Sequence, residues 1–599
     1  MGRKKGPAVS EYNWNKYQLE IFNHIQNMND NIVVEAAAGS GKTSTLLKSI
    51  TLIPETCSKL LVSFNNSIVD ELKRKLSGHG SDLTITTLHS LGKMLISQYI
   101  GEYRWGPDYY KYRSFVNENV YKMSSIRFFG RGPKATRIRN QFRENVLEYI
   151  DKGRQYLCAT VNDLDFIEER YGIETLGNEK AIAIAAMEWG MSNLEQFDFT
   201  DMLWLPHVLD IKPRRTYDFI LADECQDINK AQRMLLLRHR HEGSRMICVG
   251  DSNQAIYSFA GSDPDSFDEL KKLPNTTSLP LSISYRCAKN IVSYAQELVP
   301  SIEPNDDGRE GEVVFDVKID MFKDGDMVMC RNNAPLIHVY SELLRQGKKA
   351  YIIGKDVADK LIRNVDATRK DVLNVSCMAD GVFTRLYDDM FMERNNLMQE
   401  YNIDEKTAME DPSICDMLDV IFTLETLSEG LTTANELKDK IKSIFAEDNT
   451  GEGVILTTVH KAKGLEADRA FIICPSLMPN KNVKKDWERK QEFNLMYVAR
   501  TRAKNFLGIV EEKDKEEFIS NSDRTMKKLK RIEELINMVL MRTTKMVITS
   551  RTAMDVITKA KQINLIDPNA NNISLERSPR RAGSVAELGE MKRKRKRKL

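Results

Sequence analysis

The stretch IVVEAAAGSGKTSTLL, residues 32–47, decides the fold of this chain. It begins with three apolar β-branched residues, continues through alanine and glycine, and ends in a run with helical character. A strand, a glycine-rich turn and a helix in this order form a phosphate-binding loop, because glycines let backbone N–H groups close around phosphate oxygens. The first position of the motif is Ala36 rather than glycine, but the strand and the helix on either side support the interpretation.

This loop predicts a site for ATP and Mg²⁺. Lys42 is expected to reach the terminal phosphates, and the hydroxyl of Thr43 is expected to bind Mg²⁺. The loop residues expected to hold the nucleotide are Ala38, Gly39, Ser40, Gly41, Lys42, Thr43 and Ser44.

A second part of the same site follows the apolar run 219–222, which ends in Asp223 and Glu224. An acidic pair after a strand is by itself more often an ordinary solvated strand end. Beside a phosphate-binding loop, the pair predicts that Asp223 anchors Mg²⁺ through water and that Glu224 acts as general base on the attacking water. The apolar run 246–249 leads to Gln254, whose neutral amide is suited to sensing the γ-phosphate.

Apolar runs rich in β-branched residues recur along the chain in two groups, one before residue 280 and one after residue 310. Continuous rather than alternating hydrophobicity is typical of strands buried on both faces, as in a parallel sheet flanked by helices. We therefore predict an α/β protein with two α/β domains in tandem. The runs are 32–34, 60–62, 219–222, 246–249, 313–315, 327–329, 351–353, 454–456, 470–473 and 506–510.

Between the strand groups lie stretches of helical character, which we interpret as insertions into the two domains. Beyond residue 567 the chain is rich in Pro, Asn, Ser, Gly and charge, so we expect disorder there. The expected order is a first domain at 1–94 with 191–279, an insertion at 95–190, a second domain at 280–360 with 451–511, a reduced insertion at 361–450, a helical extension at 512–567 and a basic tail at 568–599.

Composition excludes several classes of protein. The 599 residues are too many for one core, and 41% hydrophobic with 29% charged residues fit a soluble globular chain. The net charge is only +2, so nucleic-acid contacts are expected from local patches. The 9 cysteines form no CxxC pair, which argues against a disulfide scaffold or a zinc ribbon and favours a reduced intracellular compartment. No apolar run approaches the ~18–20 residues that cross a bilayer.

The motifs, taken together, resemble those of superfamily 1 DNA helicases of the UvrD/Rep type, in the family order from Gln18 to Arg502. The form HKAKG at 460–464 is also similar to the F-box DNA helicases, although no F-box is visible. This resemblance implies two RecA-like domains with ATP held in the seam between them. The matching segments are NKYQ at 15–18, the loop at 36–43, SFNN at 63–66, TLHS at 87–90, DFTDML at 198–203, DE at 223–224, SYR at 284–286, TVHKAKGLE at 458–466 and YVARTRA at 497–503.

The resemblance also implies roles for single residues. Gln18 would read adenine, Tyr285 would stack on it and Glu466 would meet the ribose. Arg286 and Arg502 would touch the γ-phosphate and help catalyse its transfer together with Lys42, Glu224 and Gln254. Arg500 adds a cation to which we assign no role. The expected DNA contacts are Phe64, Asn65, Thr87, His89, Tyr257, Phe259, Thr458 and His460, with Tyr257 and Phe259 as stacking rings.

The function expected is ATP-driven movement on single-stranded DNA, 3′→5′ by resemblance, with unwinding at junctions of single and double strands. A translocase that strips bound proteins, and a nucleotide-dependent binding switch with little unwinding, remain alternatives. A helicase–nuclease and an RNA helicase are further ones. We expect a monomer in the resting state without membrane association; protein partners are not predicted. The protein is expected to be cytoplasmic, or nuclear through the basic run Lys592 to Lys598.

Three features leave open interpretations. The first insertion interleaves aromatic and basic residues from Tyr103 to Arg139, which fits either a DNA-binding surface or a small core of its own. The second insertion is shorter than its counterpart in the UvrD/Rep type, where that part contacts duplex and regulates unwinding. The basic tail fits a localisation signal, a nucleic-acid tether or a solubilising segment equally well.

Overall fold

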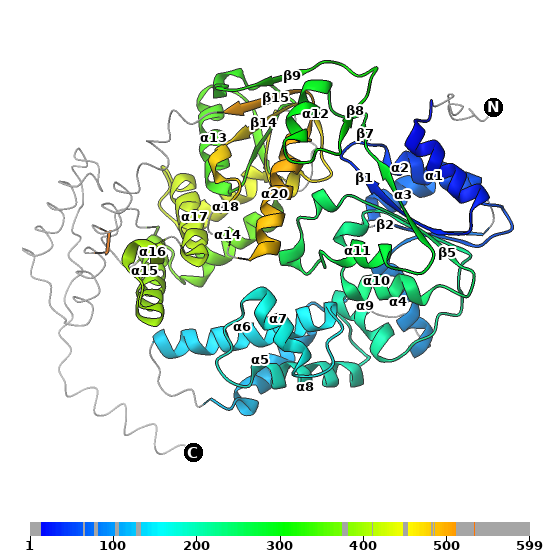
Figure 1. Ribbon diagram of the computed structural model, residues 1–599. Coiled ribbons are helices and arrows are strands. Elements are labelled where there is room, and N and C mark those ends of the chain that lie inside the picture. The colour runs from blue at the N-terminus through cyan, green and yellow to red at the C-terminus, as the bar shows by residue number, and fades with distance from the viewer. Residues whose placement is uncertain are drawn as a thin grey trace, which may run out of the picture.

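The structure is a computed structural model that describes residues 13–63, 66–76, 82–101, 107–126, 133–373, 381–409, 411–446, 453–480, 483, 485–510 and 532–533. It contains two large sheets, one of 6 and one of 7 strands, in which all the pairings are parallel. Helices cover the faces of both sheets (Figure 1). The prediction of tandem α/β domains with parallel sheets is therefore confirmed.

The first sheet has the strand order β3-β2-β4-β5-β1-β6. Successive residues of β1 enter different cores: Ile32 and Val34 pack on one face with helices α1 and α2, and Val33 packs on the other. This two-sided burial is why the strand is apolar without alternation. The strands are β1 Asn31–Ala36, β2 Lys59–Ser63, β3 Leu83–Thr87, β4 Phe219–Ala222, β5 Arg245–Gly250 and β6 Thr276–Leu281. The helices around this sheet are α1 Lys16–Asn27, α2 Lys42–Leu52, α3 Asn66–Lys75, α4 Leu88–Ile100, α9 Phe199–Val208, α10 Lys230–Arg238 and α11 Ser266–Lys271.

The second sheet has the order β12-β11-β13-β10-β14-β15-β9. Its strands are β9 Glu312–Val314, β10 Met327–Cys330, β11 Ala350–Ile353, β12 Phe445–Ala446, β13 Val454–Thr458, β14 Ala467–Ile473 and β15 Ala503–Val510. Its helices are α12 Lys289–Gln296, α13 Asn333–Arg345, α19 Val459–Ala462 and α20 Asp486–Arg500. The short strands β7 Ile283–Ser284 and β8 Glu303–Pro304 pair separately.

Two groups of helices separate the halves of these sheets along the chain. The first group is α5 Lys111–Met123, α6 Pro133–Gln155, α7 Asp163–Tyr171 and α8 Glu179–Ser192. The second group is α14 Lys355–Ala367, α15 Val382–Tyr401, α16 Glu405–Met409, α17 Pro412–Leu427 and α18 Ala434–Ile444. We name them the first and second insertions. The predicted domain boundaries stay predictions; β12 falls inside the predicted 361–450 segment, yet it pairs with β11 of the second sheet.

A buried ionic cluster fixes the first insertion to the first domain. Asp201 accepts hydrogen bonds from Lys111 Nζ at 2.7 Å, from the Tyr112 hydroxyl at 2.7 Å and from Arg154 at 2.8 Å. Arg154 also bonds both carboxylate oxygens of Asp198, which caps helix α9. The segment 198–203 thus has a structural task in this molecule, and Tyr112 and Lys111 belong to the interior rather than to a DNA-binding surface.

Replacing Asp201 with alanine is expected to destabilise the protein by about 3–5 kcal/mol, because it leaves two buried cations without their shared carboxylate. Urea denaturation followed by circular dichroism would measure the loss. Asp210→Ala is the matched control, since that carboxylate pairs with Lys212 and Arg238 at the surface. An Asp201→Ala protein as stable as the control would contradict the structural task assigned to the cluster.

Candidate functional site

The phosphate-binding loop joins β1 to α2 as the sequence predicts. Gly39 and Gly41 have φ of 72° and 84°, in the left-handed region that glycine adopts without strain. The Oγ atom of Ser40 is buried and has no hydrogen-bond partner among the described residues. Helix α2 begins at Lys42, so its free N–H groups point toward the loop. The loop is therefore a preformed cradle for an anion.

A cavity of about 620 Å³ opens directly at this loop. Its size suits a nucleotide, since ligand pockets run from ~300 to ~1,000 Å³. Both domains line it, which places Arg286 and Arg502 in the same cavity as Lys42. The lining residues are Gly39, Ser40, Gly41, Lys42, Thr43, Ser44, Ile68, Glu224, Asp227, Gln254, Tyr257, Tyr285, Arg286, Lys463, Gly464, Glu466 and Arg502.

The acidic end of β4 lies opposite the P-loop lysine. Lys42 Nζ is 3.7 Å from Glu224 Oε1. Burial opposes ionisation of Glu224, but Lys42 and Lys463 outweigh it, together with a hydrogen bond from Gln226, and lower its pKa. Burial and the neighbouring Glu224 raise the pKa of Asp223. Glu224 is thus held as a carboxylate in the absence of ligand, as a general base must be.

The residues at this cavity fit Mg²⁺ and a nucleoside triphosphate, although Asp223 itself is not among the lining residues and only its neighbour Glu224 is. A hydroxyl at Thr43 and a carboxylate at Asp223 are the hard oxygen donors that Mg²⁺ prefers. The unpartnered Ser40 Oγ and the left-handed glycines leave donors free for phosphate oxygens. Among the described residues no group of three or more His, Cys, Asp or Glu side chains is placed to hold a metal by itself.

The two cavity arginines differ in how they are held. Arg502 is 1% exposed and bonds Val498 O, Leu465 O and the side-chain oxygen of Gln254. Burial and the nearby Arg286 lower the pKa of Arg502 to about 10, so it stays charged near neutral pH. Arg286 is paired instead with Glu466, at 2.7 Å. Both arginines line the cavity, but Arg502 is fixed there by groups of its own domain and by Gln254, whereas Arg286 bonds Glu466 through Nε.

Arg500 lies outside the cavity-lining set. Its guanidinium carbon is 3.6 Å from the ring centroid of Tyr294, and Nη1 bonds Tyr294 O and Glu297. The side chain thus fastens α20 to α12. Arg500, to which the sequence assigned no role, therefore has a structural role in packing α20 against α12.

Of the predicted adenine and ribose residues, Tyr285 and Glu466 line the cavity and Gln18 does not. Tyr285 is 45% exposed on the cavity wall, and its hydroxyl accepts a hydrogen bond from the Asn15 side chain. Gln18 is outside the lining set: it is buried in the capping box of α1, and its amide donates to Thr45 Oγ1 at 3.0 Å. Glu466 lines the cavity and binds both Arg286 and Lys504.

Several contacts between the two domains involve residues to which the sequence assigned no role. The backbone N–H of Ala38 donates to the hydroxyl of Tyr497, and Lys463 forms a 2.5 Å ion pair with Asp227. Asn494 donates to the carbonyls of Ser252 and Ala255. Tyr497, Lys463 and Asp227 stand within or beside the recognised motifs, so their positions were visible in the sequence, but their partners were not.

The predicted DNA contacts divide into two groups. The rings of Phe259 and His460 meet edge to face at 5.6 Å, and the Tyr257 hydroxyl donates to His460 O. Burial, followed by the cations Arg331 and Lys461, lowers the pKa of His460 to about 3, so its ring is neutral at neutral pH. Thr458, the N-cap of α19, lies just before His460 in the chain.

The second group lies on the first domain. Thr87 caps helix α4, and the His89 ring packs edge to face against Phe199 at 5.7 Å. Tyr109 of the first insertion also packs against Phe199 and is 71% exposed. Exposed aromatic surface therefore exists beside His89, while Tyr112 of the same insertion is buried. The predicted contacts Phe64 and Asn65 lie outside the described residues, as do 103–105, 127 and 131 of the first insertion.

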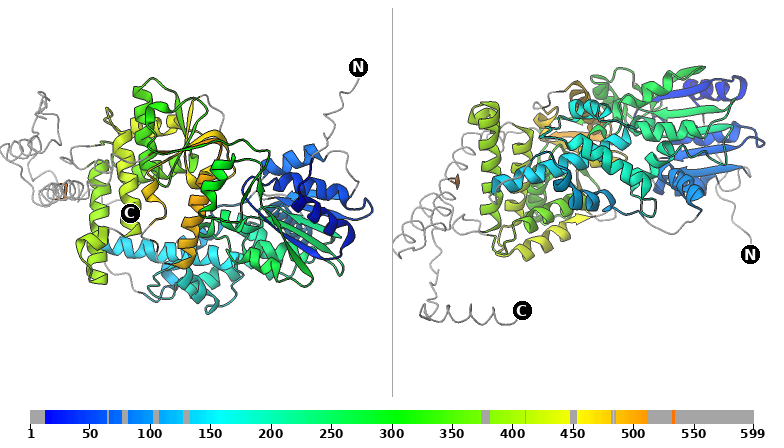
Figure 2. Two further views of the ribbon diagram at one scale, coloured as in Figure 1. Left: turned by 45° about the horizontal axis from the view of Figure 1, so that its top comes forward. Right: turned by 90° about the horizontal axis from the view of Figure 1, so that it is seen from below.

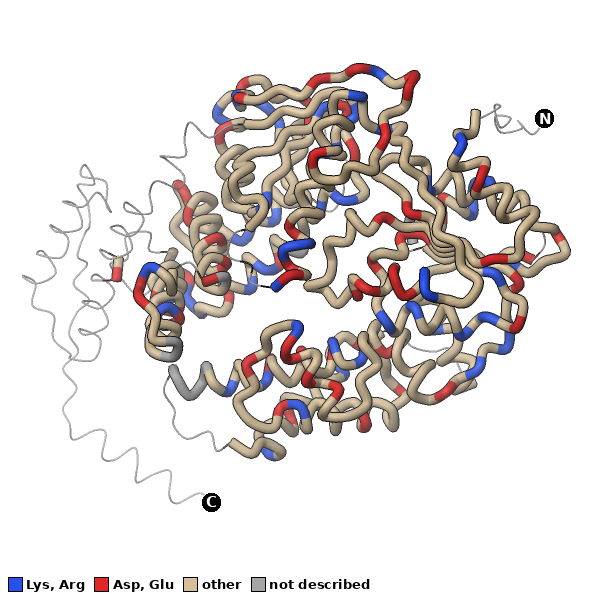
Figure 3. The backbone as a smooth tube through the Cα atoms, in the orientation of Figure 1, with Lys and Arg blue, Asp and Glu red and all other residues tan. Residues whose placement is uncertain are grey.

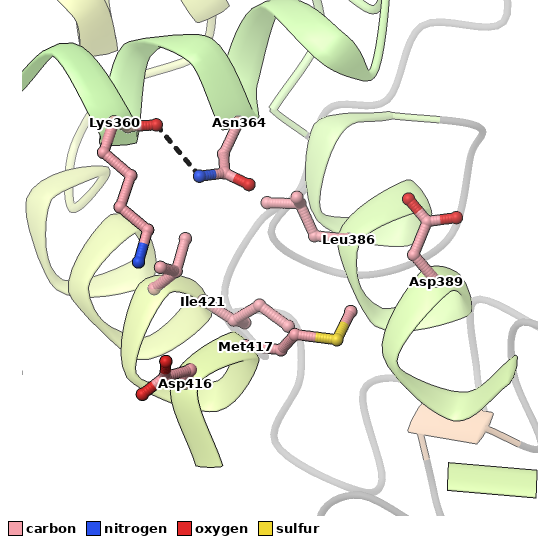
Figure 4. Close-up of a pocket in the computed structure, with 8 residues that line it drawn as sticks. Lys360, Asn364, Leu386, Asp389, Asp416, Met417 and Ile421 are labelled. Atoms are coloured by element: carbon pink, nitrogen blue, oxygen red, sulfur yellow. Dashed lines mark hydrogen bonds between the residues drawn. The ribbon is translucent and has the colours of Figure 1, made fainter. Parts of the chain in front are cut away.

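A smaller cavity of about 160 Å³ lies in the second insertion (Figure 4). It is too small for a nucleotide by comparison with the first. Asn364, at its rim, donates its amide to Lys360 O within α14. The lining residues are Lys360, Asn364, Leu386, Asp389, Asp416, Met417, Val420 and Ile421.

Charged residues of both signs are spread along the described backbone. Figure 3 shows Lys and Arg interspersed with Asp and Glu in both domains, in line with the low net charge. In the part of the chain that the structure describes, no helix is long and apolar enough to cross a membrane. The predicted basic tail and, apart from residues 532 and 533, the predicted helical extension lie outside the described residues.

Two family models match the chain. Residues 14–275 match the UvrD/REP helicase N-terminal domain, and residues 389–514 match the UvrD-like helicase C-terminal domain.

The chain is 22% identical to an ATP-dependent DNA helicase Rep of Buchnera aphidicola, over 71% of this chain and 65% of that protein. It is 23% identical to F-box DNA helicase protein 1 of Schizosaccharomyces pombe, over 79% of this chain and 55% of that protein. It is 25% identical to the ATP-dependent DNA helicase PcrA of Bacillus subtilis, over 45% of this chain and 37% of that protein. The chain thus spans less than two thirds of each of these relatives.

Proposed function

We propose, from the premise that this chain belongs to the UvrD/REP helicase family, that it is an ATP-driven motor on single-stranded DNA that unwinds duplex. The observation that carries the proposal is the shared cavity. Lys42 and Glu224 of the first domain and Arg286 and Arg502 of the second line one space of about 620 Å³. Hydrolysis in such a seam depends on how the two domains sit together, which is what a motor needs.

In this proposal each side chain has a separate task. Lys42 binds the terminal phosphates, and Thr43 and Asp223 hold Mg²⁺, which neutralises phosphate charge when bound. Glu224 takes the proton of the attacking water, and Gln254 positions the Arg502 guanidinium through their 3.3 Å hydrogen bond. Tyr285 stacks on the base, and Gln18 supports the loop from behind. Glu466 binds the ribose and, in doing so, gives up its ion pair with Arg286.

Single-stranded DNA is proposed to cross the side of the seam that carries Phe259, His460 and Thr458, and to continue past Thr87 and His89 of the first domain. Stacking on Phe259 and the neutral His460 ring would hold bases without reading their sequence. Phe64 and Asn65 complete the proposed path. The predicted division into two domains, two insertions and a C-terminal extension is retained as part of the proposal, together with an intracellular site of action.

The proposal is tested by steady-state ATP hydrolysis with and without single-stranded DNA. Stimulation by DNA is expected in the wild type and not in Lys42→Ala, which lacks the phosphate-binding ammonium. A wild-type rate that DNA does not raise would refute the motor. The same assay with single-stranded RNA separates a DNA motor from an RNA motor, because the proposed path includes no group assigned to the 2′-hydroxyl.

Direction and output are tested on 3′-tailed and 5′-tailed duplexes. We expect unwinding from the 3′ tail alone. Hydrolysis without strand separation, combined with displacement of a DNA-bound protein, would support the stripping translocase instead. DNA binding that follows nucleotide state without turnover would support the switch.

A further inference from the structure

A junction outside the nucleotide cavity connects the first insertion to helix α20. Lys485, at the start of α20, donates from Nζ to the carbonyls of Glu169 at 2.9 Å and Arg170 at 2.7 Å. The indole of Trp487 donates to Arg170 O at 3.2 Å. These carbonyls belong to the last turn of α7, where unsatisfied C=O groups attract a cation. Figure 2 shows α20 reaching the helices of the first insertion.

Aromatic rings surround the Arg170 side chain at this junction. Its guanidinium carbon lies 5.5 to 5.7 Å from the ring centroids of Tyr156, Phe166 and Trp487. Its Nε and Nη2 atoms are buried and have no hydrogen-bond partner among the described residues. The cation is therefore held largely by ring faces. Because Trp487 comes from the second domain and the other two rings from the first insertion, the cage exists only while the two parts touch.

Residues beside this junction also hold the turn that carries Ser258 and Phe259. The Tyr171 hydroxyl donates to Ser258 O at 3.3 Å, and Lys152 Nζ donates to Phe259 O at 2.9 Å. From the other side, Gln491 of α20 accepts from Ser258 N at 3.2 Å. The turn is thus held between α6 and α7 of the first insertion and α20 of the second domain.

Helix α20 leads from this junction to the nucleotide cavity. Its 15 residues make a rod of about 20 Å at 1.5 Å per residue. Tyr497, near its end, accepts a hydrogen bond from Ala38 N of the phosphate-binding loop, and Arg502 follows the helix by two residues. A shift of the helix start relative to α7 would therefore move both groups that meet the nucleotide loop.

We propose that Arg170 and Trp487 form a coupling joint through which the first insertion sets the position of α20, so that DNA held at the Phe259 turn raises the rate of ATP hydrolysis. This inference rests on the proposed function and adds two positioning residues to it. Neither residue lines the nucleotide cavity. Their effect is expected on the stimulation by DNA and not on the basal reaction.

The test compares Trp487→Ala with Phe493→Ala, a matched control that removes an aromatic ring from the same helix where it is 53% exposed. With saturating single-stranded DNA, kcat of Trp487→Ala is expected to fall ~10-fold, whereas the DNA-free rate and the KM for ATP change less than about twofold. Lys485→Met, which removes only the ammonium, is expected to give a smaller fall of the same kind. Phe493→Ala should keep the full stimulation.

A double-mutant cycle with Arg170→Ala identifies the joint itself. If both side chains act through one contact, the double variant should lose little more stimulation than Trp487→Ala alone. Stimulation retained within about twofold in Trp487→Ala, an equal fall of basal and stimulated rates, or additive losses in the cycle would each overturn the proposal. A wild type without stimulation would instead refute the motor on which the inference rests.

Discussion

Arg502→Ala is expected to lower kcat for DNA-stimulated ATP hydrolysis by about 10³-fold or more, the range measured for arginines that stabilise phosphoryl charge. The side chain is buried, fixed by four hydrogen bonds and lines the cavity. It has little reorganisation to undergo when nucleotide enters, so its loss removes a preorganised charge. Nucleotide binding should weaken far less than turnover. Single-turnover hydrolysis and equilibrium binding of a fluorescent ATP analogue would separate the two.

Arg500→Ala is the matched control for that experiment. Arg500 has the same charge and stands two residues earlier, yet it stacks on Tyr294 and bonds Glu297 instead of lining the cavity. Its removal is expected to lower the thermal stability while kcat stays within a few-fold of wild type. An Arg500→Ala enzyme that loses activity as severely as Arg502→Ala would show that the two arginines were assigned to the wrong tasks.

Glu224→Gln is expected to reduce ATP hydrolysis by about 10²–10⁴-fold, the contribution of a positioned general base. The amide keeps the size and the hydrogen-bonding reach of the side chain but cannot accept the proton of the attacking water. It also removes the negative charge 3.7 Å from Lys42, which leaves that lysine freer to bind phosphate. ATP affinity should therefore be kept or increased while turnover is lost, as measured by binding and by phosphate release.

Asp210→Asn is the control for this second substitution, since it changes a surface carboxylate outside the cavity-lining set to an amide. It should leave kcat unchanged. If Glu224→Gln hydrolysed ATP at the wild-type rate, another group would have to be the base.

The interior strands of the first sheet were predictable from the sequence, and its two edge strands were not. Each of the ten apolar runs coincides with a strand, because these strands are covered on at least one face by helices. The strands β3 and β6 lie at the two edges of the first sheet and were not predicted. Residues 83–87 read LTITT and 276–281 read TTSLPL. Edge strands are only partly covered, so they carry fewer apolar residues and leave a weak signal.

The catalytic residues of the site were predictable from local motifs, whereas their contacts between the domains were not. Lys42, Glu224 and Arg502 could be identified from local motifs, because each motif requires a given residue type at a given spacing. The structure brings these three residues together in one cavity. The sequence could not reveal that Arg286 rests on Glu466 or that Tyr497 holds the loop at Ala38. Those contacts join segments 180 and 459 residues apart, and only the packing of the two domains decides them.

The buried cluster of Lys111, Arg154, Asp198 and Asp201 has a practical consequence for attempts at a minimal enzyme. Excising residues 111–192 would strip two acids of their counter-ions and uncover an apolar interior that runs without interruption from the sheet into that segment. A trimmed chain of this kind should precipitate rather than yield a smaller active protein. The helical segment is better regarded as an integral wall of the first domain than as an accessory.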